Sequence, residues 1–190
     1  AQQHLEKHRT LLLLSSYLQL QKLEEARQLA AEMQPIFSQV TPGISDGDRL
    51  FFYLFSTAIA IARGEFDEAL EASNVMLSQK HKAVNTDIYI TGKWLNILVH
   101  YEMGNYQIVE TELRSTRRLS KQEKLDDVFE PVLARLFTKL CKAADNSKKQ
   151  ALFQWAQNEI ARIHTSGEKS MLLGYFDFDG WLERKLTPSL

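Results

Sequence analysis

Histidines are the first side chains of this sequence to consider for metal binding or catalysis. His4 and His8 lie four residues apart, with Glu6 between them. In the zinc-binding HExxH helix the glutamate directly follows the first histidine, whereas Glu6 lies two residues on and points away from both. We therefore predict no metal site here and expect two exposed histidines.

The other candidates for catalysis are scattered along the chain. His81, His100 and His164 lie far apart in sequence, and Cys141, the single cysteine, has no neighbouring histidine and cannot form an internal disulfide. No nucleophile elbow, P-loop or GxGxxG motif accompanies them. We predict a protein that is not an enzyme, with no catalytic residue and no cofactor. A helical enzyme or small-molecule sensor with a pocket between hairpins is kept as an alternative.

A cluster of basic side chains is the strongest local charge in the sequence. Its members are Arg114, Arg117, Arg118, Lys121 and Lys124, with Lys139, Lys142, Lys148 and Lys149 as an extension across the next predicted hairpin. Basic residues stabilise a helix C-terminus, so a solvated helix end is the simplest interpretation. The alternative is a nucleic-acid-associated domain that uses the basic face 114–149, although the chain has no recognisable nucleic-acid-binding module.

Composition places the chain among ordinary globular proteins. It has 190 residues, 44% hydrophobic and 25% charged, with a formal net charge of -1. This balance gives no overall attraction to nucleic acid or anionic membranes. No run reaches the roughly 18 apolar residues of a membrane span, and the start lacks the apolar region of a signal peptide. We expect a cytoplasmic location and a fragment of a longer protein.

Apolar residues at helical spacing alternate with short turns throughout the chain. A motif recurs at three of these turns: GEFDEAL at 64–70, GNYQIV at 104–109 and, more faintly, QKLEEA at 21–26. Gly64 is expected to leave its helix at positive φ. A helix, turn, helix unit that recurs at a nearly fixed period predicts stacked α-hairpins. The segment 50–63 is the most apolar and is the expected core helix.

The turn motif resembles that of the tetratricopeptide repeat (TPR). Gly64, Phe66 and Ala69 match its small residue, its aromatic residue and the alanine at the helix crossing, and Gly104 and Tyr106 match two of these positions. With a still fainter copy at Asn146, the turns at 21, 64, 104 and 146 are 43, 40 and 42 residues apart, whereas the family period is about 34. The chain thus resembles a divergent TPR-like array. Its ending, DFDGWL at 177–182, is similar to endings of uncharacterised bacterial TPR-like chains.

The resemblance implies an all-α, right-handed superhelix of about four hairpins in a single domain. The expected units are 4–39, 48–80, 86–120 and 124–165, with a capping helix at 171–186. It also implies a concave groove that binds a peptide or helix of a partner protein and is lined by His8, Gln19, Phe51, Trp94 and Tyr101. Burial in the core is the alternative for the three aromatic residues. We expect an interaction or scaffolding domain with a protein partner rather than a nucleic acid; the sequence does not indicate its oligomeric state.

Overall fold

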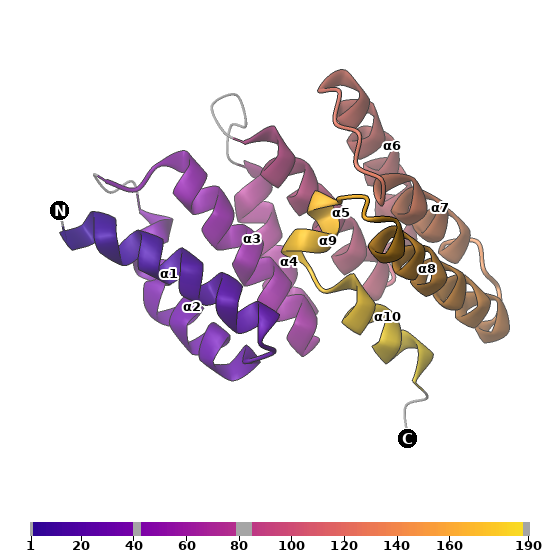
Figure 1. Cartoon of the computed structure of the whole chain (residues 1–190), viewed down its shortest axis with the longest axis horizontal. Coiled ribbons are helices and arrows are strands. Elements are labelled where there is room, and N and C mark those ends of the chain that lie inside the picture. The colour runs from indigo at the N-terminus through magenta and orange to yellow at the C-terminus, as the bar shows by residue number, and fades with distance from the viewer. Residues whose placement is uncertain (1, 40–42, 79–84, 188–190) are drawn as a thin grey trace. The chain divides into compact units, whose positions relative to one another are not determined.

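The computed structural model describes residues 2–39, 43–78 and 85–187, and the regular structure in these ranges is entirely α-helical (Figure 1). The predicted all-α class is confirmed for this part of the chain. The helices are α1 (Gln2–Gln19), α2 (Leu23–Ser38), α3 (Asp46–Arg63), α4 (Phe66–Ser78), α5 (Thr86–Glu102), α6 (Tyr106–Gln122), α7 (Glu130–Leu140), α8 (Asn146–Ser166), α9 (Met171–Tyr175) and α10 (Phe178–Leu186).

The turns between paired helices follow the recurring motif. Gly64 and Gly104 both have φ of 77°, and Gln21, which stands where the first copy lacks glycine, has φ of 56°. Gly64 caps α3 and donates its N–H to the carbonyls of Ala60 and Ile61. Ala69 is fully buried, in line with its predicted place at a helix crossing.

The linker before α3 ends in a capping box. The Ser45 hydroxyl accepts a hydrogen bond from the Asp48 N–H at 3.1 Å, and the Asp48 carboxylate accepts one from the Ser45 N–H at 2.8 Å. These reciprocal bonds satisfy backbone donors that the first turn of a helix leaves free. The helix therefore starts at Asp46, close to the predicted start of the second unit at 48.

The chain divides into two compact units, Ala1–Val99 and His100–Leu190, with the division inside α5. The sequence predicted one domain, and each unit is described here by itself. In the first unit α3 packs against α1, α2 and α4. Its buried aromatic residues include Phe52, whose ring stacks on that of Phe37 at 4.3 Å between centroids. This confirms the prediction that α3 is the core helix.

The second unit is built on α7, α8 and α10. Trp181 of α10 is buried against Phe137 of α7 and Phe153 of α8. Its indole N–H donates to Glu102 Oε1 at 2.6 Å, and Lys185 forms an ion pair with the same carboxylate. The C-terminal helix therefore covers apolar surface, as expected of a cap.

One helix is shorter than its predicted unit suggests. The fourth predicted unit begins at 124, whereas its first helix, α7, covers only Glu130–Leu140. Pro131 in the first turn fixes the helix start. Before it, the Asp127 carboxylate accepts hydrogen bonds from the backbone N–H groups of Phe129 and Met171. The local bond to Phe129 and the long-range bond to Met171 together hold the preceding residues outside the helix.

Candidate functional site

The structure changes the predicted site. Trp94 is 0% exposed and Tyr101 7% exposed, so both belong to the core, which is the alternative considered for them. The prediction that they line an exposed, partner-binding groove is therefore wrong, because a fully packed side chain offers no surface to a partner. His8 and Gln19 are exposed and Phe51 is half-buried, but none of these three lines the groove described next.

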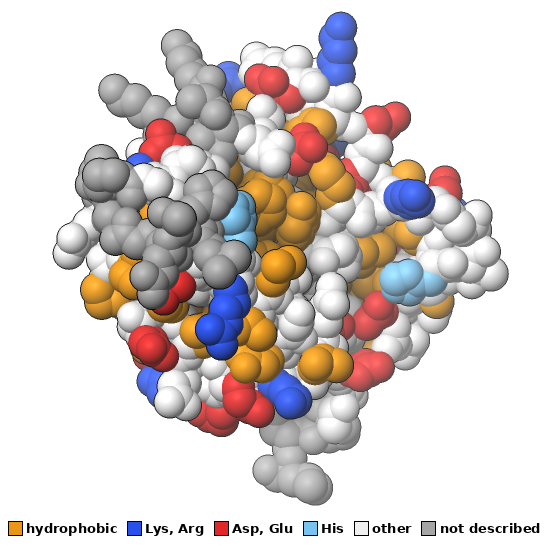
Figure 2. Space-filling model, turned by 60° about the vertical axis from the view of Figure 1, so that its left-hand side comes forward, with side chains coloured by type: hydrophobic (Ala, Val, Ile, Leu, Met, Phe, Trp, Pro, Cys, Tyr) orange, Lys and Arg blue, Asp and Glu red, His pale blue; other side chains and the backbone are white. Residues whose placement is uncertain are grey.

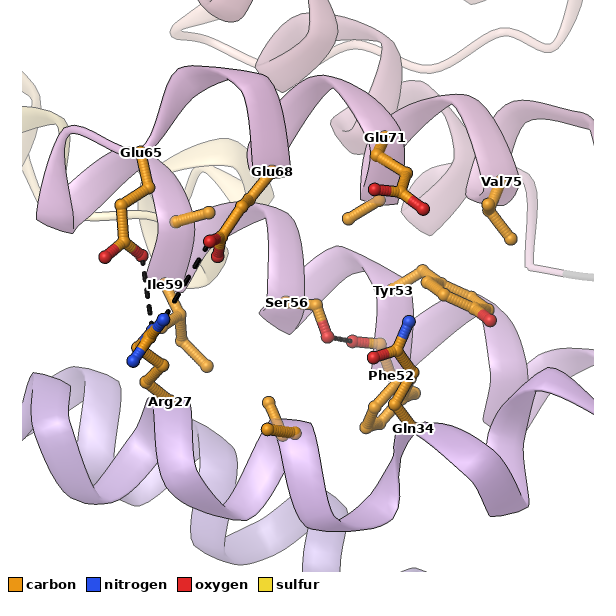
Figure 3. A pocket seen from close by; sticks show the side chains of 14 residues that line it. Arg27, Gln34, Phe52, Tyr53, Ser56, Ile59, Glu65, Glu68, Glu71 and Val75 are labelled. Carbon is orange, nitrogen blue, oxygen red and sulfur yellow. Dashed lines mark hydrogen bonds and ion pairs between the residues drawn. The ribbon is translucent and has the colours of Figure 1, made fainter.

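The first unit carries a groove between α2 and α4, with α3 beneath it (Figure 3). Its volume is ≈ 450 Å³. We call it the α2–α4 groove. It is lined by Arg27, Ala30, Ala31, Gln34, Phe52, Tyr53, Ser56, Ile59, Ala60, Glu65, Glu68, Glu71, Ala72 and Val75.

Small side chains create this space. Ala30 and Ala31 face it from α2, Ala72 from α4, and Ser56 and Ala60 from α3. A methyl or hydroxymethyl group fills little of the distance between neighbouring helices, which stand about 8–10 Å apart when packed. The groove is thus a consequence of which residues face each other across α3.

The floor of the groove is apolar. Phe52 and Ile59 are almost fully buried beneath it, and Tyr53 is 6% exposed. The Ser56 hydroxyl donates to the Phe52 carbonyl at 2.9 Å, so this hydroxyl is engaged with its own helix. The floor can therefore take apolar groups of a ligand, and the polar chemistry lies on the walls.

One wall of the groove is acidic. Glu65, Glu68 and Glu71, which we call the acidic wall, line the α4 side, and the Arg27 guanidinium reaches across from α2. Arg27 lies 3.7 Å from Glu65 Oε2 and 3.9 Å from Glu68 Oε1 (Figure 3). Since three carboxylates face one cation, the lining carries a net negative charge.

The carboxylates of the acidic wall differ in their partners. Glu65 Oε1 accepts a hydrogen bond from Arg63 at 2.9 Å, whereas Glu65 Oε2 is buried without a hydrogen bond and has only the longer ion pair with Arg27. Glu71 is exposed and forms no ion pair with a described residue. Burial raises the pKa of the Tyr53 hydroxyl; Arg49 opposes this shift and Glu71 adds to it. The wall thus has acceptor capacity for a cationic ligand.

Sequence reasoning missed this site. Carboxylates at the start of a helix stabilise its N-terminus, which explains Glu65 and Glu68 but not Glu71 in the second turn of α4. The spacing of Glu65, Glu68 and Glu71 places them along one side of a helix, which was an available signal. The facing alanines of α2 carried no signal until the packing of α2 against α3 was known.

His100, His164 and Cys141 are the described residues that the sequence singled out as candidates for catalysis. His100 contacts Asn105 at 3.3 Å and His164 contacts Asp179 at 3.1 Å, while Cys141 is half-buried. Burial lowers the pKa of His100 and raises that of Cys141. Among the described residues no group of three histidine, cysteine or acidic side chains could hold a metal ion. His81 and the His4 side chain lie outside the described residues.

Comparison with known proteins adds no relative: no family model, curated protein or solved structure matches the chain. In the part of the chain that the structure covers, no helix has the length and apolar character needed to cross a membrane. The function must therefore be argued from the α2–α4 groove itself.

Proposed function

We propose that this chain is a protein-interaction domain whose α2–α4 groove binds a peptide or helical segment of a partner protein. The observation that carries the proposal is the pairing of an apolar floor with the acidic wall in one open groove. The partner segment then carries small apolar side chains for the floor and a lysine or arginine for the acidic wall. Glycine turns within two helix pairs, at Gly64 between α3 and α4 and at Gly104 between α5 and α6, support a TPR-like superhelical array as part of this proposal.

Electrostatics favours a cationic segment over an anionic one. An arginine of the partner can donate to Glu68 or Glu71, the two exposed carboxylates of the acidic wall. Hydrogen bonds to carboxylates from guanidinium groups are among the stronger ones in proteins, so the acidic wall determines which segments bind.

The proposal can be tested by selecting peptides from a displayed random library against the whole chain. We expect enriched peptides to contain lysine or arginine beside small apolar residues. Their affinity should fall at least tenfold in the double variant Glu68→Lys, Glu71→Lys, which reverses charge on the acidic wall. It should also fall in Ala31→Trp, which fills the groove from an exposed position.

The matched control is Glu25→Lys with Glu32→Lys. Both glutamates are exposed on α2 and lie outside the lining of the groove, so the change in net charge is the same. Equal loss of affinity in the control and in the acidic-wall variant would show that binding depends only on net charge. Enriched peptides that tolerate Ala31→Trp would show that they bind elsewhere, and either result would reject the proposal.

A further inference from the structure

Helix α6 presents a row of cations to solvent. Arg114, Arg117, Arg118 and Lys121 are all exposed, and we call these four residues the α6 basic stripe. Arg117, Arg118 and Lys121 follow Arg114 by three, four and seven residues. This spacing places all four side chains on one face of the helix. The opposite face is packed in the core through Val109, Leu113, Thr116 and Ser120.

A favourable interaction with the helix dipole does not account for this row. Its effect falls off within the last turn of a helix, and Lys121 is the basic residue in the last turn of α6. Arg114 lies two turns before the helix end at Gln122. Stabilisation of the helix C-terminus therefore does not explain the three arginines.

The stripe is also free of ion pairs with the described residues. Three other cations of the second unit are paired: Arg162 lies 3.1 Å from Glu159, Lys148 lies 3.2 Å from Asp145, and Lys185 contacts Glu102. The four side chains of the α6 basic stripe have no carboxylate within ion-pair distance in the part of the chain that is described. Their charge is available to a ligand.

Lys142, one member of the predicted extension, lies away from the α6 basic stripe. Arg117 interacts electrostatically with Glu130 at the start of α7, whereas Glu110, near the start of α6, interacts with Cys141 just after α7. The two helices are thus antiparallel, and Lys142 follows Cys141 at the end of α7 that adjoins the acidic first half of α6. The cationic surface on this side is the α6 basic stripe.

We propose that the α6 basic stripe binds the phosphate backbone of a nucleic acid without reading its sequence. From Arg114 to Lys121 the stripe is about 10 Å long at 1.5 Å per residue, a length that covers about three phosphates of one DNA strand. Guanidinium groups match phosphate oxygens in a bidentate manner. A membrane-surface helix needs an exposed apolar face beside its cations, whereas the apolar face of α6 lies in the core.

The test is fluorescence anisotropy of the whole chain with two labelled probes, a uridine oligonucleotide of about 20 nucleotides and a DNA duplex of similar length. We expect binding whose logarithmic salt dependence has a slope of roughly -2 for the single strand and roughly -3 for the duplex, the values for about three phosphate contacts. The double variant Arg114→Glu, Arg118→Glu should lose at least tenfold in affinity. Because both side chains are exposed and neither is the arginine that interacts with Glu130, its thermal melting should match that of the parent.

The control is Arg9→Glu with Lys22→Glu, which changes the net charge by the same amount at exposed positions of the first unit. We expect this variant to lose less than threefold. An equal loss in both variants, the absence of parent binding at low salt, or binding to anionic vesicles in place of either probe would overturn the proposal. The groove variant Ala31→Trp should retain nucleic-acid binding, so this result is independent of the peptide test.

Discussion

Gln21 and Gly64 have the same left-handed backbone conformation at equivalent turns, with φ of 56° and 77°. Each follows the first helix of a pair, α1 for Gln21 and α3 for Gly64. A residue with a Cβ atom takes up this conformation at a cost of about 1–2 kcal/mol, which glycine avoids. The fold therefore retains the turn at 21 even though the sequence has lost the glycine that favours it.

This relationship predicts that Gly64→Ala lowers the free energy of unfolding by about 1–2 kcal/mol. A Cβ atom at Gly64 would have no atom within 4 Å, so the cost comes from the backbone alone. Urea unfolding followed by circular dichroism measures it. Gly174→Ala in α9 is the control, because its Cβ atom would also meet open space but its φ is not positive. Equal stability of the two variants would contradict the explanation.

The helix pairs could be predicted because their signals are local. Apolar spacing and the turn residues at 21, 64 and 104 lie within a few positions of the helices they delimit. The shorter α7 could not be predicted, since Asp127 bonds to Met171, 44 residues away in sequence. The groove could not be predicted for a similar reason. It depends on which alanines of α2 face the acidic wall across α3.

The aromatic residues show where a family resemblance misleads. Alignment on Gly104 placed Trp94 and Tyr101 in a groove, yet both pack in the core. Periodicity tells which side chains share a face of a helix, but it does not tell whether another helix covers that face. We therefore expect Trp94→Ala to cost about 3–5 kcal/mol, the range for a buried aromatic residue.

The Trp94 prediction is measured by thermal and urea unfolding beside Phe55→Ala, since Phe55 is also buried, with 6% exposure. The two variants should be destabilised to a similar extent. Phe51→Ala is the contrast, because Phe51 is half-buried and should cost less. If Trp94→Ala were as stable as the parent, Trp94 would be a surface residue and its place in the predicted groove would be restored.

Gly92 and Met76 pack against each other in the first unit. A Cβ atom at Gly92 would lie 2.3 Å from Met76 Cε and 2.5 Å from Met76 Sδ, and Met76 is fully buried. Alanine usually stabilises a helix interior relative to glycine by about 1 kcal/mol. Here we expect the opposite sign, a loss of about 1–3 kcal/mol in Gly92→Ala, because the methionine must move within a packed core.

A double-mutant cycle with Met76→Ala checks this contact. Met76→Ala alone should cost about 2–5 kcal/mol, since it leaves a cavity. In the double variant the new methyl group occupies part of that cavity, so the combined loss should be smaller than the sum of the single losses. Strict additivity would mean that the two residues do not compete for the same space.

The ion pair between Lys7 and Asp48 predicts a pH dependence of stability. Lys7 Nζ lies 2.7 Å from Asp48 Oδ2 and joins α1 to α3. Burial opposes ionisation of Asp48, but hydrogen bonds from Lys7 and Ser45 outweigh it and hold its pKa below the ordinary 3.8. The contribution of this carboxylate is therefore complete above pH 3.8 and is lost as the pH falls through the lower pKa of the folded state.

We expect Asp48→Asn to lower the free energy of unfolding at neutral pH by about 1.5–3 kcal/mol, the range for a hydrogen bond to a charged group. The difference between parent and variant should shrink as the pH falls below 3.8, because protonation removes the same charge from the parent. Urea unfolding from pH 7 downward measures this difference. Lys7→Met should reduce the acid dependence in the same way, since it removes the donor that lowers the pKa. A difference that stays constant down to the lowest pH would show that the Asp48 charge does not stabilise the fold.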